Sequence, residues 1–488
     1  MPANIVAYII LTFAVAMGIV ISFFNFNRSV VIKLGFIWVG ILTAAMFGGM
    51  LVVAVFGIAI AMSLREDPPE LKLFYFIGLL PILPLQVFQI PFPLVNYLWG
   101  VNFPKLLVLS LLFPLFFSYI NKALEDGVVF RLSDSFFLMF FLVTTLLEVR
   151  SGTIANIIRN IFDSVIEYGA IYFAISYYLR SPHSLNWFFS FFLISASFIS
   201  FISIAGSLVG WRLYGEILQA MNLVYGPAAL IPYSRGFVTR ASGGAMLQPL
   251  AVALYSAIVI VTAYFMMQKK QLKPLFGIPL MLVYLTVLIF TNSRGGWLVA
   301  MIGIAMLYYM KLNKVLKLLM SAVGTGLVVS VILFLAVGDL SAIDPEGTFQ
   351  YRVDLISNSM SAVSNNLLFG SANFMSDPAL QASMQGEGII DIVNMYLEIA
   401  LRKGLAALIP FIMVFIILIR DMAAKKGVMG TDHKDLLVAI LVMIMVFVAT
   451  CSSTSFIQWY VIIFLAVARA YTGFAEPQTS SVQASTSS

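Results

Sequence analysis

The stretch PLFGIPLMLVYLTVLIF-TNSRGG-WLVAMIGIAMLYYM, residues 274–310, holds two long apolar runs separated only by the short segment TNSRGG. A helix of about 20 apolar residues spans the ~30 Å hydrocarbon core of a bilayer. We therefore predict two membrane helices, at 274–292 and 297–310, joined by a tight turn that contains Arg294. We expect the rest of the chain to cross the membrane repeatedly in the same way.

Composition extends this interpretation to the whole chain. Of its 488 residues, 61% are hydrophobic and 10% are charged, and the mean hydropathy is +1.00. A water-soluble domain could not bury so much apolar surface. We predict an all-α polytopic membrane protein with about fourteen transmembrane helices, at 4–24, 35–61, 73–93, 104–120, 134–149, 162–179, 184–207, 246–267, 274–292, 297–310, 315–337, 404–419, 436–450 and 456–470.

The prolines of the third predicted span make it unusual. Pro81, Pro84, Pro91 and Pro93 all fall within or at the end of 73–93. Proline lacks a backbone N–H and disrupts helices, so we expect this span to be kinked or re-entrant.

Lysine and arginine distribute unequally over the predicted loops. The lysine-rich segments 268–273, 311–317 and 420–434 lie an even number of crossings apart, and a Lys/Arg excess in short loops marks the cytoplasm. This orientation places both termini in the cytoplasm, with eleven of the fourteen lysines inside and nine of the fourteen arginines outside. Because the guanidinium fork binds phosphate oxygens bidentately, the outer arginines predict a phosphorylated ligand on that face.

Loop lengths suggest four regions. Residues 1–337 would hold eleven helices, with an outer loop near 208–245, and residues 404–470 the last three. The segment 338–403 would be a large periplasmic loop, in which helix-like apolar spacing predicts short helices packed over the bundle. The Ser/Thr-rich tail at 471–488 has little to bury, so we expect it to be disordered in the cytoplasm.

Two outer arginines stand beside glycine pairs, Arg240 in Arg-Ala-Ser-Gly-Gly and Arg294 in Ser-Arg-Gly-Gly. Glycine permits close backbone approach to phosphate, although it equally suits any helix turn. The span 297–310 would measure only roughly 21 Å, so we expect Arg294 to lie below the outer surface. A recessed arginine needs an anion or a wet cavity, unless it snorkels to lipid headgroups.

Other outer residues have competing interpretations. Arg352 lies early in the large loop, and Arg150 and Arg159 flank another outer connection, where local ion pairing with nearby carboxylates is the alternative to ligand binding. The residues Asp391, Asn394, Glu398 and Arg402 are spaced to share one helical face. A carboxylate on that face would suit a general base, or the segment is an amphipathic helix that shows its polar side to water.

Several classes of chemistry have little support. Both histidines, His183 and His433, fall in predicted cytoplasmic loops, so proton transfer outside would be left to Asp, Glu, Tyr or the substrate. Cys451 is the only cysteine, which excludes intramolecular disulfides. We see no metal-ligand spacing and no basic run of the kind that binds nucleic acid, and we expect no cofactor.

Three motifs, in order, resemble the O-antigen ligase and polymerase (Wzy-type) superfamily of bacterial envelope glycosyltransferases. They are Arg240-Ala-Ser-Gly243, Ser293-Arg294-Gly295, and Asn366-Leu-Leu-Phe-Gly370 followed by Val393-Asn394-Met395-Tyr396-Leu397 and Gly404. The similarity spans roughly 233–410. Many ligases of the superfamily carry His-Asn where this chain has Val393-Asn394, which favours the members that polymerise exopolysaccharide or O-antigen repeat units.

The resemblance implies a membrane core related to the GT-C class of glycosyltransferases, in the bacterial inner membrane. It implies metal-independent, inverting transfer of a glycan from an undecaprenyl-pyrophosphate donor to a sugar hydroxyl in the periplasm, with a polysaccharide chain-length regulator as a candidate partner. We assign Arg240 and Arg294 to the pyrophosphate, with Arg352 assisting, and Asp391 or Glu398 to the acceptor hydroxyl, unless orientation alone suffices. The remaining expected substrate-binding residues are Arg150, Arg159, Arg235, Tyr351, Asn394 and Arg402.

Two alternatives stay open. A ligase would use the same donor and arginines but transfer the glycan to lipid A core or to protein. A flippase for lipid-linked oligosaccharide would also bind pyrophosphate in an arginine-lined cavity, although this chain lacks the two matching halves typical of transporters.

Overall fold

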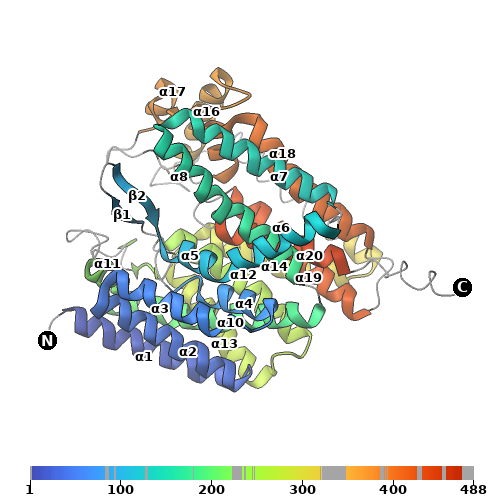
Figure 1. Ribbon diagram of the computed structural model, residues 1–488. Helices are drawn as coiled ribbons and strands as arrows, with labels where there is room; N and C mark the ends of the chain where they lie inside the picture. The colour runs from blue at the N-terminus through green and yellow to red at the C-terminus, as the bar shows by residue number, and fades with distance from the viewer. Residues whose placement is uncertain are drawn as a thin grey trace, which may run out of the picture.

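The computed structural model shows a bundle of helices with the N-terminus at the left of Figure 1 and the C-terminus at the right. It describes residues 3–82, 87–92, 95–126, 130–179, 181–221, 234–235, 238–243, 246, 248–318, 320, 348–384, 390, 392, 394–425, 431–452 and 458–474.

The described part of the chain is helical apart from two short antiparallel hairpins, which confirms the all-α prediction. Its α-helices are α1 Ala3–Phe23, α2 Arg28–Thr43, α3 Gly49–Ser63, α4 Pro69–Leu79, α5 Phe103–Leu107, α6 Phe113–Asp126, α7 Leu132–Leu147, α8 Ile154–Ser164, α9 Ile171–Tyr178, α10 Pro182–Val209, α11 Leu213–Ala220, α12 Pro249–Gln268, α13 Pro274–Phe290, α14 Arg294–Lys311, α16 Thr348–Asn365, α17 Pro378–Gln381, α18 Met395–Lys425, α19 Thr431–Cys451 and α20 Gln458–Phe474. The hairpin strands are β1 Phe88–Phe92 with β2 Val95–Val101, and β3 Ser234–Arg235 with β4 Val238–Thr239.

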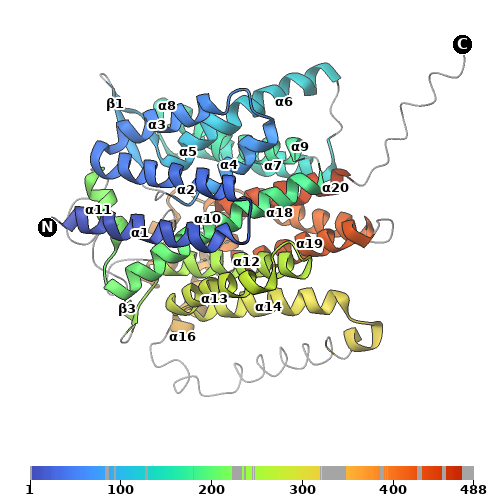
Figure 2. The ribbon, with the colours of Figure 1, turned by 90° about the horizontal axis from the view of Figure 1, so that it is seen from below.

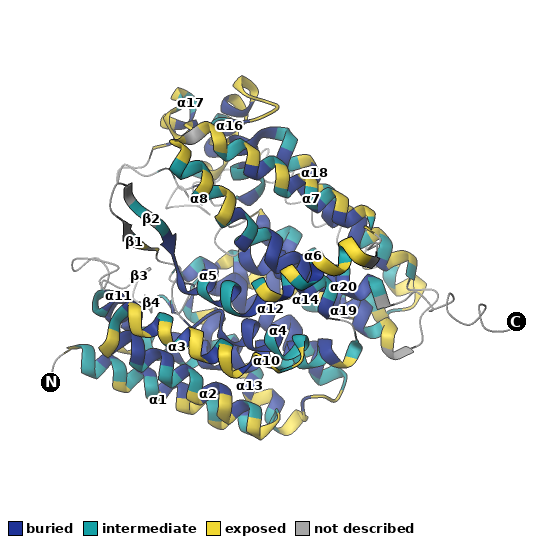
Figure 3. Ribbon diagram, viewed as in Figure 1, coloured by how far each residue is buried: buried dark blue, intermediate teal, exposed yellow. Residues whose placement is uncertain are grey.

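Eight helical segments among these residues are long and apolar enough to cross a membrane, and α13 and α20 are shorter apolar helices. The chain is therefore a multi-pass membrane protein. Burial is graded across the bundle: 78% of the apolar window of α10 and 83% of that of α12 are buried, against 33% for α1. Figure 3 shows the same gradient, with buried residues gathered on α10, α12, α19 and α20 and exposed residues along the helices at the periphery of the bundle.

The predicted span 35–61 is two helices rather than one. Helix α2 continues through a π-helical turn, Ala44–Gly48, and the chain reverses at Gly49. The φ of Gly49 is 69°, a positive value that glycine adopts without steric cost. A Cβ at Gly40 would lie 2.6 Å from the Phe56 ring, a contact that requires α3 to fold back along α2. Hydropathy alone misses this reversal because both arms are apolar.

The reversal adds one crossing and changes the predicted topology. Asn25, after α1, donates a hydrogen bond from Nδ2 to the Phe276 carbonyl (3.1 Å), and Phe24 stacks on the Phe276 ring. Phe276 directly follows the lysine-rich segment 268–273, so α1 ends at that end of the bundle and begins at the other. The prediction that both termini are cytoplasmic is therefore wrong: if the lysine-rich end is cytoplasmic, Ala3 lies at the outer end with α11 (Figure 1) and Phe474 at the cytoplasmic end. On the same orientation, Arg28 lies at the cytoplasmic end and leaves the outer set. We name the lysine-rich end of the bundle the cytoplasmic end, and the opposite end the outer end, on this predicted orientation.

The third predicted span, 73–93, is not one continuous helix, and it is interrupted among its prolines as we expected. Helix α4 ends at Leu79, two residues before Pro81, which has no N–H to continue the helical hydrogen bonds. The chain then forms the β1–β2 hairpin, with Phe88 opposite Val101 and a register shift between Ile90 and Phe92, around Pro91.

Three further predictions concern the large loop, the span 315–337 and the C-terminal tail. Helices α16 and α17 confirm short helices within the large loop, which the structure describes from residue 348. The predicted span 315–337 lies almost wholly outside the described residues. Helix α20 continues to Phe474, just beyond the predicted start of the tail at 471, and residues 475–488 lie outside the described part.

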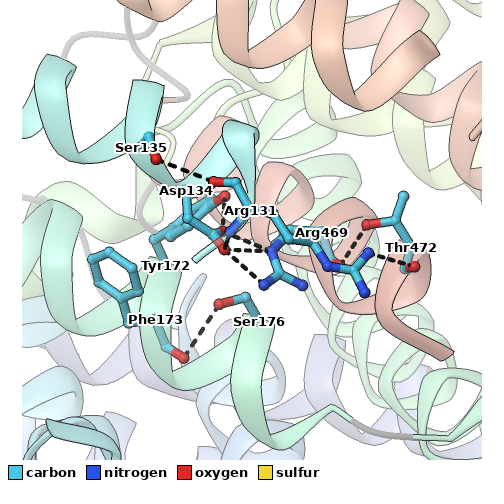
Figure 4. Close-up of polar contacts among 8 residues, drawn as sticks. All are labelled: Arg131, Asp134, Ser135, Tyr172, Phe173, Ser176, Arg469 and Thr472. Carbon is cyan, nitrogen blue, oxygen red and sulfur yellow. Dashed lines mark hydrogen bonds and ion pairs between the residues drawn. The ribbon is translucent and has the colours of Figure 1, made fainter. Parts of the chain in front are cut away.

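A buried ion pair ties three helices together at the cytoplasmic end (Figure 4). Arg469 of α20 bonds both carboxylate oxygens of Asp134 in α7, from Nε to Oδ1 (2.6 Å) and from Nη2 to Oδ2 (2.6 Å). Tyr172 of α9 donates to the same carboxylate (3.1 Å). Arg131 donates to the Thr472 carbonyl (2.6 Å). Removing one partner of such a pair leaves an unpaired buried charge, so Arg469 is structural, while Arg131 ties the start of α7 to the end of α20.

Candidate active site on the outer face

The Arg240 segment is joined to the end of α13. The Ala241 N–H donates to the Phe290 carbonyl (2.9 Å), and Arg240 Nε donates to the Thr291 carbonyl (2.7 Å). Arg240 is half-buried. The chain turns at Asn292, which has a φ of 47°, and continues directly into Arg294. The Arg240 segment and the Ser293-Arg294-Gly295 turn, far apart in the sequence, are therefore neighbours at the outer end.

Arg294 is the first residue of α14 and is exposed. The helix has 18 residues, about 27 Å at 1.5 Å per residue, rather than the expected 14. A helix of this length does not draw Arg294 below the outer surface, contrary to our expectation. No ion-pair or hydrogen-bond partner of its guanidinium occurs among the described residues. Ser293 does not cap α14 with its side chain, so the free N–H groups of the first turn add to the positive charge there.

Glycines after Arg294 bring α14 onto the core. A Cβ at Gly296 would stand 2.6 Å from Ala253 Cβ, and one at Gly303 would stand 2.4 Å from Val261, both in α12. Figure 2 shows α12, α13 and α14 side by side. A Cβ at Gly295 meets no atom within 4 Å. Of these glycines, two serve packing, and Gly295 leaves open space beside Arg294.

A separate cavity of about 100 Å³ lies at the outer end of α7 and the start of α18. Glu398 and Arg402 both line it, which confirms that they share one helical face. Glu148 and Lys403 line it too and form an ion pair, in which the Lys403 side chain is 8% exposed. Its other walls include Phe140, Thr144, Ser164, Tyr168, Met395, Phe411 and Ile462.

Helix α18 is interrupted at Gly404, where the backbone leaves helical angles, and a crossing of two backbone segments fixes this break. Gly370 and Gly404 both have positive φ, 62° and 69°. The Leu405 and Ala406 N–H groups donate to the Leu367 and Leu368 carbonyls, both at 2.9 Å. The second helical segment of α18 begins after Gly404, and these carbonyls satisfy donors in its first turn that would otherwise be left free. This crossing explains why Asn366-Leu-Leu-Phe-Gly370 and Gly404 belong to one motif.

Arg150 locks the same crossing. It donates from Nη1 to the Gly370 carbonyl (2.9 Å) and from Nη2 to the Arg402 carbonyl (3.1 Å), while Nε bonds Leu147 within its own turn. From the sequence we expected the Arg150 guanidinium to bind substrate, or else to pair with a nearby carboxylate. In the structure it binds backbone carbonyls of the protein instead. Arg150 is a positioning residue for α18.

Arg159 is similarly engaged with the β1–β2 hairpin. Its Nη1 bonds Asn156 Oδ1 (2.7 Å), its Nη2 bonds the Tyr97 carbonyl, and its guanidinium lies 3.9 Å from the Tyr97 ring centroid. The nearby carboxylates pair elsewhere. Buried Lys105 contacts Asp163 Oδ1 (2.7 Å) and Glu167 Oε1 (3.4 Å).

The other predicted site residues are more dispersed. Asn394 caps the start of α18, accepting from the Leu397 N–H (3.0 Å). Arg352 is exposed on α16, and Tyr351 beside it packs against a small core formed with α18. Arg235 lies in β3. Asp391 lies outside the described residues.

We did not predict Lys403 as a member of the site from the sequence, and Glu148 is one of the carboxylates that we considered only as local ion-pair partners of Arg150 and Arg159. Their pairing joins positions 255 residues apart. The one local signal in the sequence was the residue type of Lys403, because most basic residues on the predicted outer side are arginines. Both histidines lie at the cytoplasmic ends of α10 and α19. Among described residues, no three His, Cys, Asp or Glu side chains gather as in a metal site.

Residues 279–412 match the family model described as O-antigen ligase. The match runs from within α13 to α18 and so contains the Arg294 turn, Arg352 and both glycines of the backbone crossing. It confirms the resemblance predicted from the motifs, and it indicates a membrane protein that transfers glycans. No curated protein matches the chain.

We expect Gly404→Ala to lower the free energy of unfolding by about 3 kcal/mol, because φ is positive there and the added Cβ would overlap the backbone. That Cβ would stand 2.3 Å from the Leu368 carbonyl oxygen. Gly295→Ala is the matched control, since its Cβ would meet open space. Thermal unfolding in detergent measures both. Equal stability of the two variants would show that the crossing does not hold α18.

We expect Arg150→Lys to lower the unfolding temperature by several degrees and to reduce the rate of glycan transfer. One ammonium group cannot satisfy the Gly370 and Arg402 carbonyls with the geometry of a planar fork. Arg420→Lys, an exposed change at the cytoplasmic end, serves as the control. Wild-type stability and rate in Arg150→Lys would remove its role in positioning α18.

Proposed function

We propose that this protein polymerises undecaprenyl-pyrophosphate-linked oligosaccharide repeat units into O-antigen or exopolysaccharide at the periplasmic face of the bacterial inner membrane. One observation carries the proposal: the hydrogen bond from Arg240 Nε to the Thr291 carbonyl, which brings Arg240 beside the turn that presents Arg294. Two arginines and the N-terminus of α14 thereby gather at the outer end of the bundle. Arginine forks and free helix N–H groups both favour a phosphorylated ligand.

The pyrophosphate is the leaving group in this reaction. The acceptor hydroxyl oxygen forms a bond to the anomeric carbon, while the bond from that carbon to the pyrophosphate oxygen breaks and leaves its electron pair on the pyrophosphate. Negative charge therefore grows where Arg240 and Arg294 stand. Fixed positive groups aimed at developing charge are a major source of catalysis, and they would do here what a divalent metal does in other enzymes.

The acceptor hydroxyl also loses a proton, and the cavity on α18 supplies a candidate base. Glu398 lines it and is half-buried, with Arg402 one turn further on the same face. Glu148 is less suited because it is already paired with Lys403. Asp391, three residues before Asn394, remains the alternative base.

The polymerase is preferred to a ligase on one feature of the sequence, Val393-Asn394 in place of the ligase His-Asn. A ligase would use the same arginines and would differ in its acceptor, lipid A core or protein. Purified protein supplied with lipid-linked repeat units alone distinguishes them, since only a polymerase yields long polymer. Elongation in detergent, without any gradient, would also exclude a flippase. A chain-length regulator is the partner we expect in cells.

We expect Arg294→Lys to reduce the elongation rate by about 10²-fold, on the scale of removing one donor from a transition-state site. Lysine retains the charge but loses the bidentate fork. Arg420→Lys again controls for a charge-conserving change elsewhere. Polymer formation near the wild-type rate would refute the pyrophosphate role of Arg294.

Glu398→Gln and Asp391→Asn, made separately, identify the base. The variant that removes it should lose about 10²-fold or more in turnover, with little change in donor binding, because each amide keeps the size of the acid. Normal turnover in both variants would mean that neither carboxylate takes the proton.

A further inference from the structure

A groove of about 510 Å³ lies far from the candidate active site, between α3 and the segment from α5 to α6. Its walls are almost entirely apolar and include Gly57, Ile58, Ala61, Leu106, Leu109 and Pro114. A Cβ at Gly57 would meet no atom within 4 Å, so α3 leaves open space along this wall. Its volume falls in the range of ligand sites, roughly 300–1,000 Å³.

Two cations stand at one end of this apolar groove. Arg65 follows α3, and Lys72 lies in α4; both line the groove, and Lys72 Nζ donates to the Arg65 carbonyl (2.9 Å). That bond holds the Lys72 ammonium group beside the Arg65 backbone, at the end of the groove that both residues line. Among described residues, neither cation forms an ion pair with a carboxylate.

The carboxylates closest in sequence do not line the groove. Glu70 accepts a hydrogen bond from Ser184 of α10 (2.6 Å). Neither Glu66 nor Asp67 is part of its wall. The groove therefore pairs an apolar channel with a positive mouth, which is the complement of a molecule with a hydrocarbon chain and an anionic head.

The position of the mouth identifies the leaflet. Helix α3 starts beside α11 at the outer end and finishes at Ser63, so Arg65 lies at the lysine-rich end of the bundle. Given that this end faces the cytoplasm, the mouth opens at the cytoplasmic headgroup layer, whose anionic lipids attract basic residues. The arginines assigned to the pyrophosphate stand at the opposite end, which argues against the lipid-linked donor as the occupant.

We propose that this groove is a binding site for an anionic glycerophospholipid of the cytoplasmic leaflet, with an acyl chain along α3 and the phosphate at Arg65 and Lys72. The site is separate from the transfer reaction, so its occupancy can be tested whether or not the proposed function holds.

The test is lipid binding to the purified full-length protein, followed by native mass spectrometry and by thermal unfolding in detergent. Phosphatidylglycerol, phosphatidylcholine with the same acyl chains, and undecaprenyl phosphate are the probes. Wild-type protein should bind phosphatidylglycerol most tightly. Arg65→Gln with Lys72→Gln should weaken that binding about 25-fold, at about fivefold for each interfacial cation, while leaving phosphatidylcholine binding unchanged.

Two further variants complete the test. Gly57→Phe fills the groove without changing charge and should abolish the stabilisation by phosphatidylglycerol. Lys270→Gln with Lys273→Gln removes two cations at the same end of the bundle, away from the groove, and should leave binding at the wild-type level. Equal binding of the two phospholipids, loss of selectivity in the control pair, or preferential binding of undecaprenyl phosphate at this groove would each overturn the proposal.

Discussion

The crossing of the chain at Gly370 and Gly404 is the constraint on which the outer face depends. Only glycine tolerates these backbone angles at so close an approach, and the Leu367 and Leu368 carbonyls supply the hydrogen bonds that the new helix start needs. Arg150 fastens the crossing through two carbonyl oxygens. The direction of the first turns of α18, and with it the position of Glu398 and Arg402 over their cavity, follows from these bonds.

The outer end divides into two regions of different charge. The turn between α13 and α14 is purely cationic, with Arg294 exposed at a helix N-terminus and Arg240 bound alongside. The cavity at the start of α18 is mixed, holding two carboxylates and two cations. Helix α19 packs against both α14 and α18 and so lies between the two regions. This division suits a reaction that stabilises an anionic leaving group at one place and removes a proton at another.

Much of this could be predicted from local pattern. Periodicity placed Glu398 and Arg402 on one face because both residues belong to one helix. Length alone could have revealed the α2–α3 reversal, since Arg28–Ser63 has 36 residues, about 54 Å of helix against a core of about 30 Å. Because we predicted a single helix in place of α2 and α3, we placed the N-terminus at the wrong end of the bundle. The role of Arg150 could not be predicted, because its two acceptors lie 220 and 252 residues away and are backbone atoms. The same holds for Lys403, whose partner Glu148 belongs to another helix.

The central claim is that the pyrophosphate of a lipid-linked donor binds between Arg240 and Arg294 at the N-terminus of α14. A cryo-electron-microscopy structure of the protein with an undecaprenyl-pyrophosphate-linked repeat unit tests it directly. We expect phosphate density within hydrogen-bonding distance of both guanidinium groups, with the glycan extending toward the cavity at Glu398. Phosphate density bound elsewhere, with both arginines unoccupied, would contradict it.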